Sequence, residues 1–551
     1  MLDPGVAFAQ VKRPSDRELP ATPPIAPPTL PELVLPEAPR TAPGRPSTGD
    51  RVLIRTVRVV GNSALSLQDL APAIRHFEGR VLSTEGFEEL RLALTRVYIE
   101  RGYVNSGALL PDQEILDGVV TYRIVEGRLS SIKIEGNART RDFYIRDRIW
   151  REVGTPLNVR DLRRAIQLLL QDAAIKTVNA TLEPGIRPGE ARLHVIVEEN
   201  LPFALGFSVD NSNSRSVGST LGKISASLLN VAGFGERLTF NLEKSSGSRS
   251  THVEAGIPVT KWDMRASFSY EATRSTIIEE PFDLIDLQTD FDAWNAGLAH
   301  PVYRSANWTF ELEAEFERKR ALTTIFDRRF SLEDGAENGR SVVAVGRFIQ
   351  NLLYRDRQQV FAFRSTFSKG LNALDANWSD DADTPSGNFV AWLGQAQYVR
   401  RLQAVPFELV LRAEIQTTQD RLLGLEKFAI GGLDSLRGYR TNQLVRDRGY
   451  TGSVEVRIPL GNLRVPQISE SERDGVVQFA PYFDYGRAWD NRVRNLDPKS
   501  LYGFGLGLRW QLNRMTGASF YWNVLRKDVA KPLDEDATDR GIYFRISSKL
   551  Y

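Results

Sequence analysis

Two segments of the sequence carry side chains that can form an ion pair. Arg437 lies in the glycine-rich segment 431–439, and Asp484 lies in the aromatic segment 481–486. A guanidinium group can bind a carboxylate through two parallel, charge-assisted hydrogen bonds. Period-two alternation places Asp484 and Tyr482 on the face of an extended strand opposite to Phe483. The residues therefore predict an Arg437–Asp484 pair if segment 431–439 folds onto the strand, and they fit a solvent-exposed arginine and aspartate about equally well.

The composition argues against an enzyme, a metal protein and a nucleic-acid-binding protein. The chain has no cysteine and only four histidines, which lie far apart in the sequence, so a zinc ion would lack its usual ligands. No Gly-x-Ser-x-Gly or Gly-x-x-x-x-Gly-Lys-Ser/Thr motif occurs, and these are signals of a serine hydrolase and of a phosphate-binding loop. A net charge of +2 gives no reason to expect a polyanionic partner. We therefore predict no catalytic residue, cofactor, metal ion or nucleic acid.

Short alternating strands fill the chain from Phe203 to its end, and sixteen of them can be counted. In segment 308–316, for example, apolar side chains alternate with polar ones. No run of eighteen apolar residues occurs, so a helical membrane span is excluded. Strands of a membrane barrel alternate lipid-facing and lumen-facing side chains. We predict an all-β membrane domain at 201–551, a 16-stranded antiparallel barrel whose lumen is lined by Arg265, Glu311, Glu313, Glu315, Arg412, Glu414 and Arg509.

The connections between these strands alternate in length, as expected for a barrel with long loops at one end and tight turns at the other. A soluble β-sandwich gives no reason for this bias. Segment 461–475 is an exception, because it is long where a tight turn is expected. Long connections are predicted at 272–289, 317–340, 369–387, 417–449, 486–500 and 525–540, and short ones near 231–235, 258–263, 300–306, 351–358, 399–406 and 512–516.

An internal repeat precedes the barrel strands. The segment Val57–Asn62 recurs as Ile132–Asn137, and each copy begins with an alternating strand and a Gly-Asn turn. Each copy continues with a helix, which Ser83 or Thr84 can cap in the first copy and Asn158 in the second. A strand closes each copy. The sequence therefore predicts two small α+β domains, at 52–128 and 129–200.

The segment before the repeat does not have the composition of a packed domain. Residues 10–51 are rich in proline, which is typical of an extended linker. Residues 1–9 end in the small-x-small pattern Ala7-Phe8-Ala9, which is typical of a signal-peptidase site. We therefore interpret residues 1–9 as the remnant of a signal peptide.

Together, the repeat, the strands and the two segments resemble the two-partner secretion transporters (the TpsB family, of the ShlB/FhaC/HecB type), relatives of the barrel-assembly insertase BamA. The resemblance implies two POTRA domains before the barrel, and a sixth loop that folds inward. The loop motif of the family, Val-Arg-Gly-Tyr, is matched here by Leu436-Arg437-Gly438-Tyr439. Its strand motif, Phe-x-Phe-Asp-x-Gly, is matched at Phe483, Asp484 and Gly486, with Pro481 at the first Phe position.

Two features depart from the family. Many of its members carry a plug helix in the lumen, but only the short polar stretch Ser15–Leu19 precedes the prolines here. The last residue, Tyr551, is aromatic, as barrel-assembly signals require, yet it is out of step with the apolar alternation that ends at Leu550. Because the stretch before the prolines is so short, a plug helix is not predicted.

The resemblance implies a function in protein export. The POTRA domains would bind an unfolded exoprotein, such as an adhesin or a haemolysin, in the periplasm, and the barrel would secrete it without ATP (type Vb secretion). The other expected partners are outer-membrane lipid and, during biogenesis, the barrel-assembly machinery. An insertase of the BamA type is the alternative, against which two POTRA copies instead of more argue. The expected location is the bacterial outer membrane, with the POTRA domains in the periplasm.

Overall fold

The computed structural model describes residues 32–35, 51–402, 405–469, 471–472, 474–529 and 535–550. These residues fall into two compact units, one made of 29–200 with 230–235 and the other of 201–229 with 236–551. The interpreted signal-peptide remnant, the stretch Ser15–Leu19 and Tyr551 lie outside the described residues, as does most of the proline-rich segment.

The first repeat copy is a small α+β domain. Its three-stranded sheet has the order β3-β6-β5, and a second sheet pairs β2 with β4. The predicted helix is α3, with Ser83 at its N-cap. A helix that the sequence reading missed, α2, starts at a capping box in which Ser66 and Asp69 bond each other's backbone amides. The elements are β2 (Val52–Ile54), β3 (Thr56–Val60), α2 (Leu67–Arg75), β4 (Arg80–Leu82), α3 (Thr84–Glu100), β5 (Gly107–Leu109) and β6 (Val119–Val125).

The second copy repeats this plan with a longer sheet. Its strands lie in the order β8-β9-β7, and the short strand β1 (Glu32–Val34) from the proline-rich segment pairs with the outer edge of β8. Asn158 caps α5, since its side chain accepts a hydrogen bond from the amide of Arg160. The helix α4 was not predicted. The elements are β7 (Arg128–Glu135), α4 (Asp142–Glu152), α5 (Val159–Leu169), β8 (Ile175–Pro184) and β9 (Glu190–Glu199).

The Gly-Asn turn has the same construction in both copies. Gly61 and Gly136 have φ angles of +82° and +84°, a region that favours glycine. A glutamate at the end of the domain then binds the amides after the turn. Glu126 accepts from Ala64 at 2.7 Å, and Glu199 accepts from Thr140 at 2.7 Å. Burial acts to raise the pKa of both carboxyl groups, but these hydrogen bonds outweigh it and lower the pKa.

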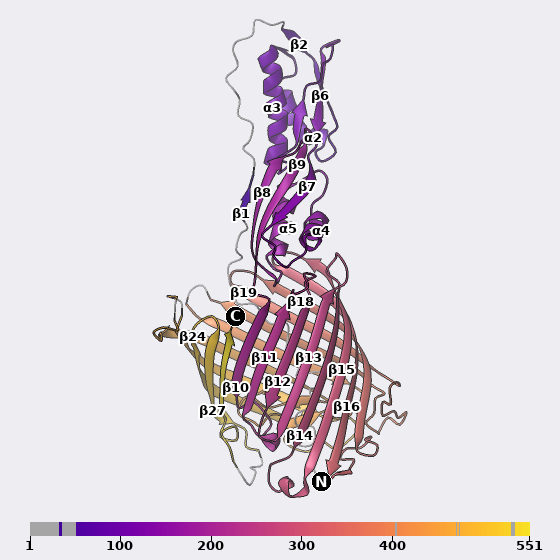
Figure 1. The fold of residues 1–551 in the computed structure, drawn as a ribbon, viewed down its shortest axis with the longest axis vertical. Coiled ribbons are helices and arrows are strands. Elements are labelled where there is room, and N and C mark those ends of the chain that lie inside the picture. Colours follow the sequence, from indigo (N-terminus) through magenta and orange to yellow (C-terminus); the bar gives the residue numbers. More distant parts are fainter. Residues whose placement is uncertain are drawn as a thin grey trace. The chain divides into compact units, whose positions relative to one another are not determined.

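The remaining residues form a closed antiparallel barrel, seen in Figure 1 as long tilted strands. Among the described residues it has sixteen strands of eight or more residues and the two-residue strand β17 (Arg328–Arg329). The first half contains β10 (Phe203–Asp210), β11 (Leu221–Leu229), β12 (Arg237–Lys244), β13 (Ser248–Pro258), β14 (Arg265–Thr276), β15 (Leu287–Arg304), β16 (Trp308–Ile325) and β18 (Arg340–Arg355). The second half contains β19 (Gln359–Leu371), β20 (Val390–Arg401), β21 (Glu408–Thr418), β24 (Arg448–Asn462), β25 (Val476–Trp489), β26 (Ser500–Gln511), β27 (Thr516–Arg526) and β28 (Ile542–Leu550).

The barrel is closed by pairing between its first and last strands, β10 and β28, with Asp210 opposite Arg545. We call this pairing the seam. It joins two short strands, of 8 and 9 residues, whereas β15 and β16 have 18 residues each. The seam is thus a short junction in the wall.

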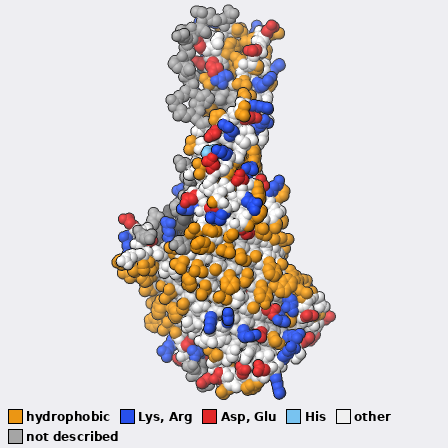
Figure 2. Space-filling model, in the orientation of Figure 1, with side chains coloured by type: hydrophobic (Ala, Val, Ile, Leu, Met, Phe, Trp, Pro, Cys, Tyr) orange, Lys and Arg blue, Asp and Glu red, His pale blue; other side chains and the backbone are white. Residues whose placement is uncertain are grey.

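The two faces of the barrel strands differ in polarity. Figure 2 shows hydrophobic side chains gathered over the outer face of the strands, while charged side chains gather at the end of the barrel drawn at the bottom. Phe483 is 47% exposed on the outer face, whereas its neighbour Asp484 is fully buried on the inner one. An apolar outer face is what lipid requires. Among the described residues, no helix is long and apolar enough to cross a bilayer.

Several predicted connections are shorter than expected, because the strands continue into them. The prediction that 317–325 belongs to a surface connection is wrong, since β16 runs to Ile325. The same holds for 272–276, which is the end of β14. In both strands the alternation continues past the apolar belt, with polar side chains such as Thr273 and Lys319 buried inside. The long segment between β24 and β25 is present as a connection, at 463–475.

Candidate functional site: a loop folded into the barrel

The connection between β21 and β24, residues 419–447, folds onto the inner wall of the barrel, and we call it the inward loop. It contains a small hairpin made of β22 (Phe428–Ile430) and β23 (Leu444–Arg446). Apolar side chains of the loop pack against side chains of the strands β20, β25 and β26 in one buried cluster. This cluster consists of Phe428, Ile430, Leu436, Tyr439, Leu444, Leu393, Ala488 and Leu501.

Arg437 is held at the tip of the loop by two strands of the wall. Its Nε and Nη2 atoms donate to the two oxygens of Asp484, each at 2.8 Å, and its backbone amide donates to Asp484 at 3.0 Å. Its Nη1 atom pairs with Glu455, and the guanidinium lies 3.6 Å from the ring centre of Tyr482. Glu455 also pairs with Arg457 at 2.8 Å. We call Arg437, Asp484, Glu455 and Arg457 the tip cluster.

Two glycines of the motifs leave room for these contacts. Gly438 has a φ angle of +100°, and a Cβ atom there would lie 2.5 Å from the side chain of Asn523. At Gly486, a Cβ atom would lie 3.0 Å from the Leu436 side chain and 3.1 Å from that of Ile430. The absence of a side chain at Gly486 therefore lets the loop pack directly on β25.

The backbone of the tip is held by the last strands of the barrel. The Tyr439 hydroxyl donates to the carbonyl of Tyr502 at 2.7 Å and accepts from the amide of Lys527 at 2.8 Å. The Tyr543 hydroxyl donates to the Tyr439 carbonyl, and the Asn523 amide donates to the Arg437 carbonyl at 3.1 Å. Leu436, Arg437, Gly438 and Tyr439 thus each contact the wall.

The tip also contacts both sides of the seam. Asp434 accepts from Arg545 of β28 at 2.8 Å, and Arg545 in turn pairs with Asp210 of β10 at 3.3 Å. Thr441 donates through its hydroxyl to the carbonyl of Ser212, just after β10, at 2.6 Å. Arg440 pairs with Asp539, just before β28, at 2.5 Å. One short segment therefore spans the junction of the first and last strands.

A second buried group of charges holds the first part of the loop. Glu426 of the loop pairs with Arg347 of β18 at 2.8 Å and with Lys319 of β16 at 3.3 Å. Glu317 of β16 pairs with the same Arg347 at 2.9 Å. We call Glu426, Arg347, Lys319 and Glu317 the base cluster. All four residues are less than a tenth exposed.

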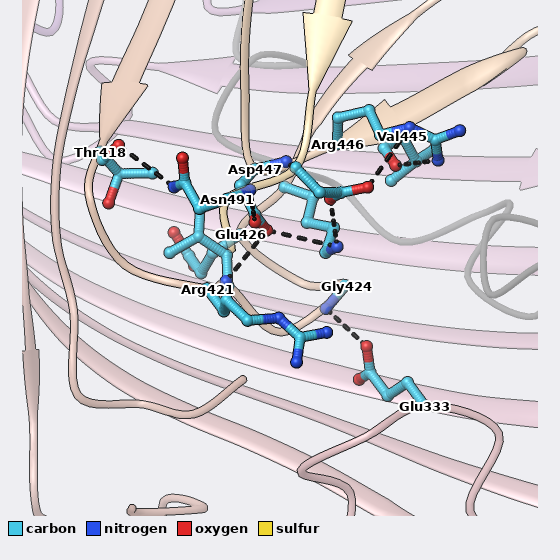
Figure 3. Close-up of polar contacts among 12 residues, drawn as sticks. Glu333, Thr418, Arg421, Gly424, Glu426, Val445, Arg446, Asp447 and Asn491 are labelled. Atoms are coloured by element: carbon cyan, nitrogen blue, oxygen red, sulfur yellow. Dashed lines mark hydrogen bonds and ion pairs between the residues drawn. The ribbon is translucent and has the colours of Figure 1, made fainter. Parts of the chain in front are cut away.

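The two ends of the loop are tied together near the base cluster, as Figure 3 shows. The carboxylate of Asp447 accepts from the amides of Leu422 at 3.1 Å and Asn491 at 2.8 Å. Lys427 pairs with Asp447 at 3.2 Å. Glu333 accepts from the amide of Gly424 at 2.8 Å, as drawn in Figure 3. The inward loop is therefore a folded element with contacts at both ends and at its tip.

The structure brings together the residues that the sequence singled out. Arg437 and Asp484 lie in direct contact, whereas Phe483 faces away from the loop on the outer surface. The base cluster, Glu455, and the contacts of Asp434 and Arg440 were not predicted. Only Glu455 has a signal in the sequence that could have indicated it. It is a charged residue at an inner position of its strand, between the apolar residues Val454 and Val456.

Comparison with known proteins places the chain in a family. Residues 189–510 match the family described as haemolysin secretion/activation protein ShlB/FhaC/HecB, and residues 52–127 match the ShlB-type POTRA domain. The outer membrane transporter CdiB of Dickeya dadantii is 24% identical over 476 residues, which cover 84% of this chain and 82% of the relative.

Two solved structures show the same fold. CdiB from Escherichia coli matches with a TM-score of 0.67 at 20% identity, covering 95% of this chain and 94% of that one. BamA from Haemophilus ducreyi lacking POTRA domains 1–3 matches with a TM-score of 0.52 at 14% identity, covering 91% and 100%. The chain therefore belongs to the ShlB/FhaC/HecB family of two-partner secretion transporters and is a protein of the bacterial outer membrane whose POTRA domains lie in the periplasm.

Proposed function

We propose that the barrel conducts an unfolded exoprotein to the cell surface and that the inward loop closes the lumen until that cargo arrives. The observation that carries this proposal is the set of polar contacts between the loop and the wall. Hydrogen bonds and ion pairs can be exchanged for bonds to water or to a passing chain. A loop whose tip and base are fixed in this way, beside its apolar packing on the wall, can be released without unfolding the barrel.

The lumen offers an environment in which an extended polypeptide can be hydrated. A polar cavity inside the barrel is lined by charged side chains of both signs, among them Lys223, Glu243, Glu254, Glu271, Glu313 and Arg364. An unfolded chain presents backbone polar groups that need partners at every residue. A wall with mixed charge can supply or hydrate them without binding any one sequence tightly. ATP is not required if cargo folds at the surface and cannot diffuse back.

The POTRA domains would receive the cargo by strand addition, in which an extended peptide joins the edge of a sheet. The strands at the two edges of the sheet in the first domain are β3 and β5, with 5 and 3 residues. In the second domain they are β7, with 8 residues, and β8, with 10 residues, of which only three pair with the short strand β1. A longer edge offers more unpaired backbone groups to a peptide. We therefore assign the receiving edge to β8.

Secretion of a co-expressed exoprotein tests the proposal. The exoprotein encoded beside this gene should reach the culture medium with the wild-type transporter and remain in the periplasm without it. Arg437→Ala should reduce secretion, whereas Arg328→Ala, which removes an exposed arginine from a surface connection, should not. An insertase would instead change the amounts of many outer-membrane proteins when the chain is depleted. That outcome, with unaltered secretion, would exclude the transport function.

A further inference from the structure

The outer wall of the barrel has a hollow over Gly222, next to the seam. Its volume is about 540 Å³, and residues of β10, β11, β12 and β13 surround it. A Cβ atom at Gly222 would have a single neighbour within 4 Å, the carbonyl oxygen of Lys244 at 3.8 Å, so the missing side chain leaves the space open. The apolar side chains that line the hollow are Phe207, Val209, Ile224 and Leu242. The hollow therefore has the size and the lining to hold an acyl chain of the surrounding lipid.

Basic side chains form a row along one end of the hollow. The strand register places Gly222 opposite Lys244, Lys244 opposite Arg249, and Arg249 opposite Arg274. Side chains that lie directly opposite each other share a face of the sheet, and like charges in such positions destabilise it. Arg274 is compensated by Asp290, at 2.7 Å. Lys244 and Arg249 form no ion pair within the part of the chain that the structure describes, and we call these two residues the cation pair.

The carboxylate nearest to the cation pair in the sequence is already compensated. Alternation places Glu243 on the inner face of β12, where it pairs with Lys223 at 2.9 Å. Both members of the cation pair are exposed. The register thus keeps two positive charges together on the outer face, without an anion from the described part of the chain between them. An anion from outside the protein would remove their repulsion.

The cation pair lies at the outer rim of the surface that faces lipid. The chain enters β10 from the POTRA domains, which lie in the periplasm, so the other end of β10, near Val209, is the outer one. Val209 lies opposite Gly222, in the same row as the cation pair. On the face that shows β10 to β13, the hydrophobic band gives way to charged side chains toward the end drawn at the bottom (Figure 1, Figure 2). Long basic side chains at such a rim reach the level of the lipid headgroups.

We propose that the hollow and the cation pair form a binding site for a phosphate-bearing lipid of the outer leaflet. The phosphate binds between Lys244 and Arg249, because a guanidinium can donate two parallel hydrogen bonds to phosphate and an ammonium binds it as a point charge. An acyl chain of the same lipid lies in the hollow along Phe207 and Ile224. Since Phe207 belongs to β10, a lipid bound here also packs against one strand of the seam.

Native mass spectrometry of the full chain in a non-ionic detergent tests the site. The probe is dipalmitoyl phosphatidate, and the fraction of protein that carries the lipid at increasing concentration gives the dissociation constant. Lys244→Gln combined with Arg249→Gln should weaken binding about tenfold or more, because both charged donors to the phosphate are lost. The control, Arg328→Gln combined with Arg329→Gln, removes two exposed arginines of a surface connection. It changes the net charge equally and should bind the lipid as the wild type does.

The two halves of the site can be tested separately. Dipalmitoylglycerol has the same acyl chains without the phosphate, and it should bind the wild type about tenfold more weakly or less well still. Gly222→Val fills the hollow with a residue that strands accommodate, and it should weaken binding of phosphatidate several-fold. Millimolar inorganic phosphate should not displace the lipid, because it makes no contact with the apolar side chains. Displacement would show that the cation pair binds free anions and that a lipid is not the ligand.

Equal binding of phosphatidate to the wild type and to the Lys244→Gln, Arg249→Gln variant would overturn the proposal. Equal binding of phosphatidate and dipalmitoylglycerol to the wild type would overturn it as well, because the hollow would then hold acyl chains without recognising phosphate. Heat-modifiable migration of the barrel shows whether each variant is folded. The glutamine variant changes only exposed side chains of the outer face, so the barrel should fold.

Discussion

The tip cluster and the base cluster hold the same loop with opposite arrangements of charge. At the tip, the loop contributes the cation, and Arg437 lies between two carboxylates of the wall, Asp484 and Glu455. At the base, the loop contributes the anion, and Glu426 lies between two cations of the wall, Arg347 and Lys319. The wall therefore has a carboxylate pocket near β24 and β25 and a cationic pocket near β16 and β18, and each fixes the loop in one orientation.

The clusters also differ in what remains when the loop member is removed. At the base, Glu317 still pairs with Arg347 after the loss of Glu426. At the tip, Glu455 keeps Arg457, but Asp484, which is fully buried, loses both donors of the Arg437 guanidinium. A buried charge that is left without a partner costs more free energy than a buried charge that keeps one partner of opposite sign. The tip should therefore be the more sensitive of the two.

The largest effect is expected for Arg437→Ala. Removing one member of a buried ion pair typically costs about 3–5 kcal/mol, and the hydrated lumen should bring the cost towards the lower value. A cost of about 3 kcal/mol favours loop release by roughly a hundredfold. Single-channel conductance in planar bilayers should rise and become unsteady, and secretion should fall, while the heat-resistant barrel stays folded. Conductance like that of Arg328→Ala would show that the tip cluster does not hold the loop.

Exchanging the two charges tests the pair itself. Arg437→Asp and Asp484→Arg should each disturb the loop, because each places two like charges in contact. Together they restore opposite charges, although Glu455 remains beside position 437, so the rescue should be partial. A coupling free energy of about 0.5–3 kcal/mol is expected for residues in contact. Conductance and protease sensitivity of the four proteins give this value, and simple additivity would argue against a direct contact.

Glu426→Gln should have an intermediate effect. The amide can still accept a hydrogen bond from Arg347, but the ion pairs with Arg347 and Lys319 are lost. Loss of a hydrogen bond to a charged group costs about 1.5–3 kcal/mol, and Glu317 compensates part of it. Secretion should fall by less than in Arg437→Ala. If the loss of secretion is greater, the base cluster is the main anchor of the loop, and the comparison above is reversed.

The smallest effect is expected for Asp434→Asn. The Asp434 side chain is 68% exposed, although it pairs with Arg545 at 2.8 Å, and exposed pairs contribute at most about 1 kcal/mol. Secretion and conductance should stay within about twofold of the wild type. Loop release in this variant as strong as that in Arg437→Ala would shift the main anchor from the tip cluster to the contact at the seam.

The sequence predicted features that repeat over short distances. Alternation of side chains over ten or more residues indicated the barrel, and the solved structures of relatives confirm that fold. The same period placed Asp484 and Tyr482 on the inner face, where both are buried. The family assignment, which rested on the two motifs and the repeat, is also confirmed.

The features that escaped prediction depend on contacts between distant residues. Glu426 and Arg347 are 79 residues apart, and no local pattern joins them. Strand β1 has 3 residues in a proline-rich segment, and a period of two cannot be read from so few. The ends of β14 and β16 were missed because they lie beyond the apolar belt of the outer face. Their inner positions carry charged or polar side chains there, and this composition resembles that of a loop.

The contacts of the inward loop with the seam have a consequence for how the protein is made. Thr441 bonds to Ser212, 229 residues earlier in the sequence, while Tyr543 bonds to Tyr439, 104 residues earlier. These partners flank β10 and lie in β28, at opposite ends of the barrel sequence, and they come together only when the ring is complete. The loop therefore cannot take up its full set of bonds on a partly assembled barrel. Protection of the loop from protease should for that reason be one of the last events in biogenesis, and it marks the moment at which the wall has no free edge left.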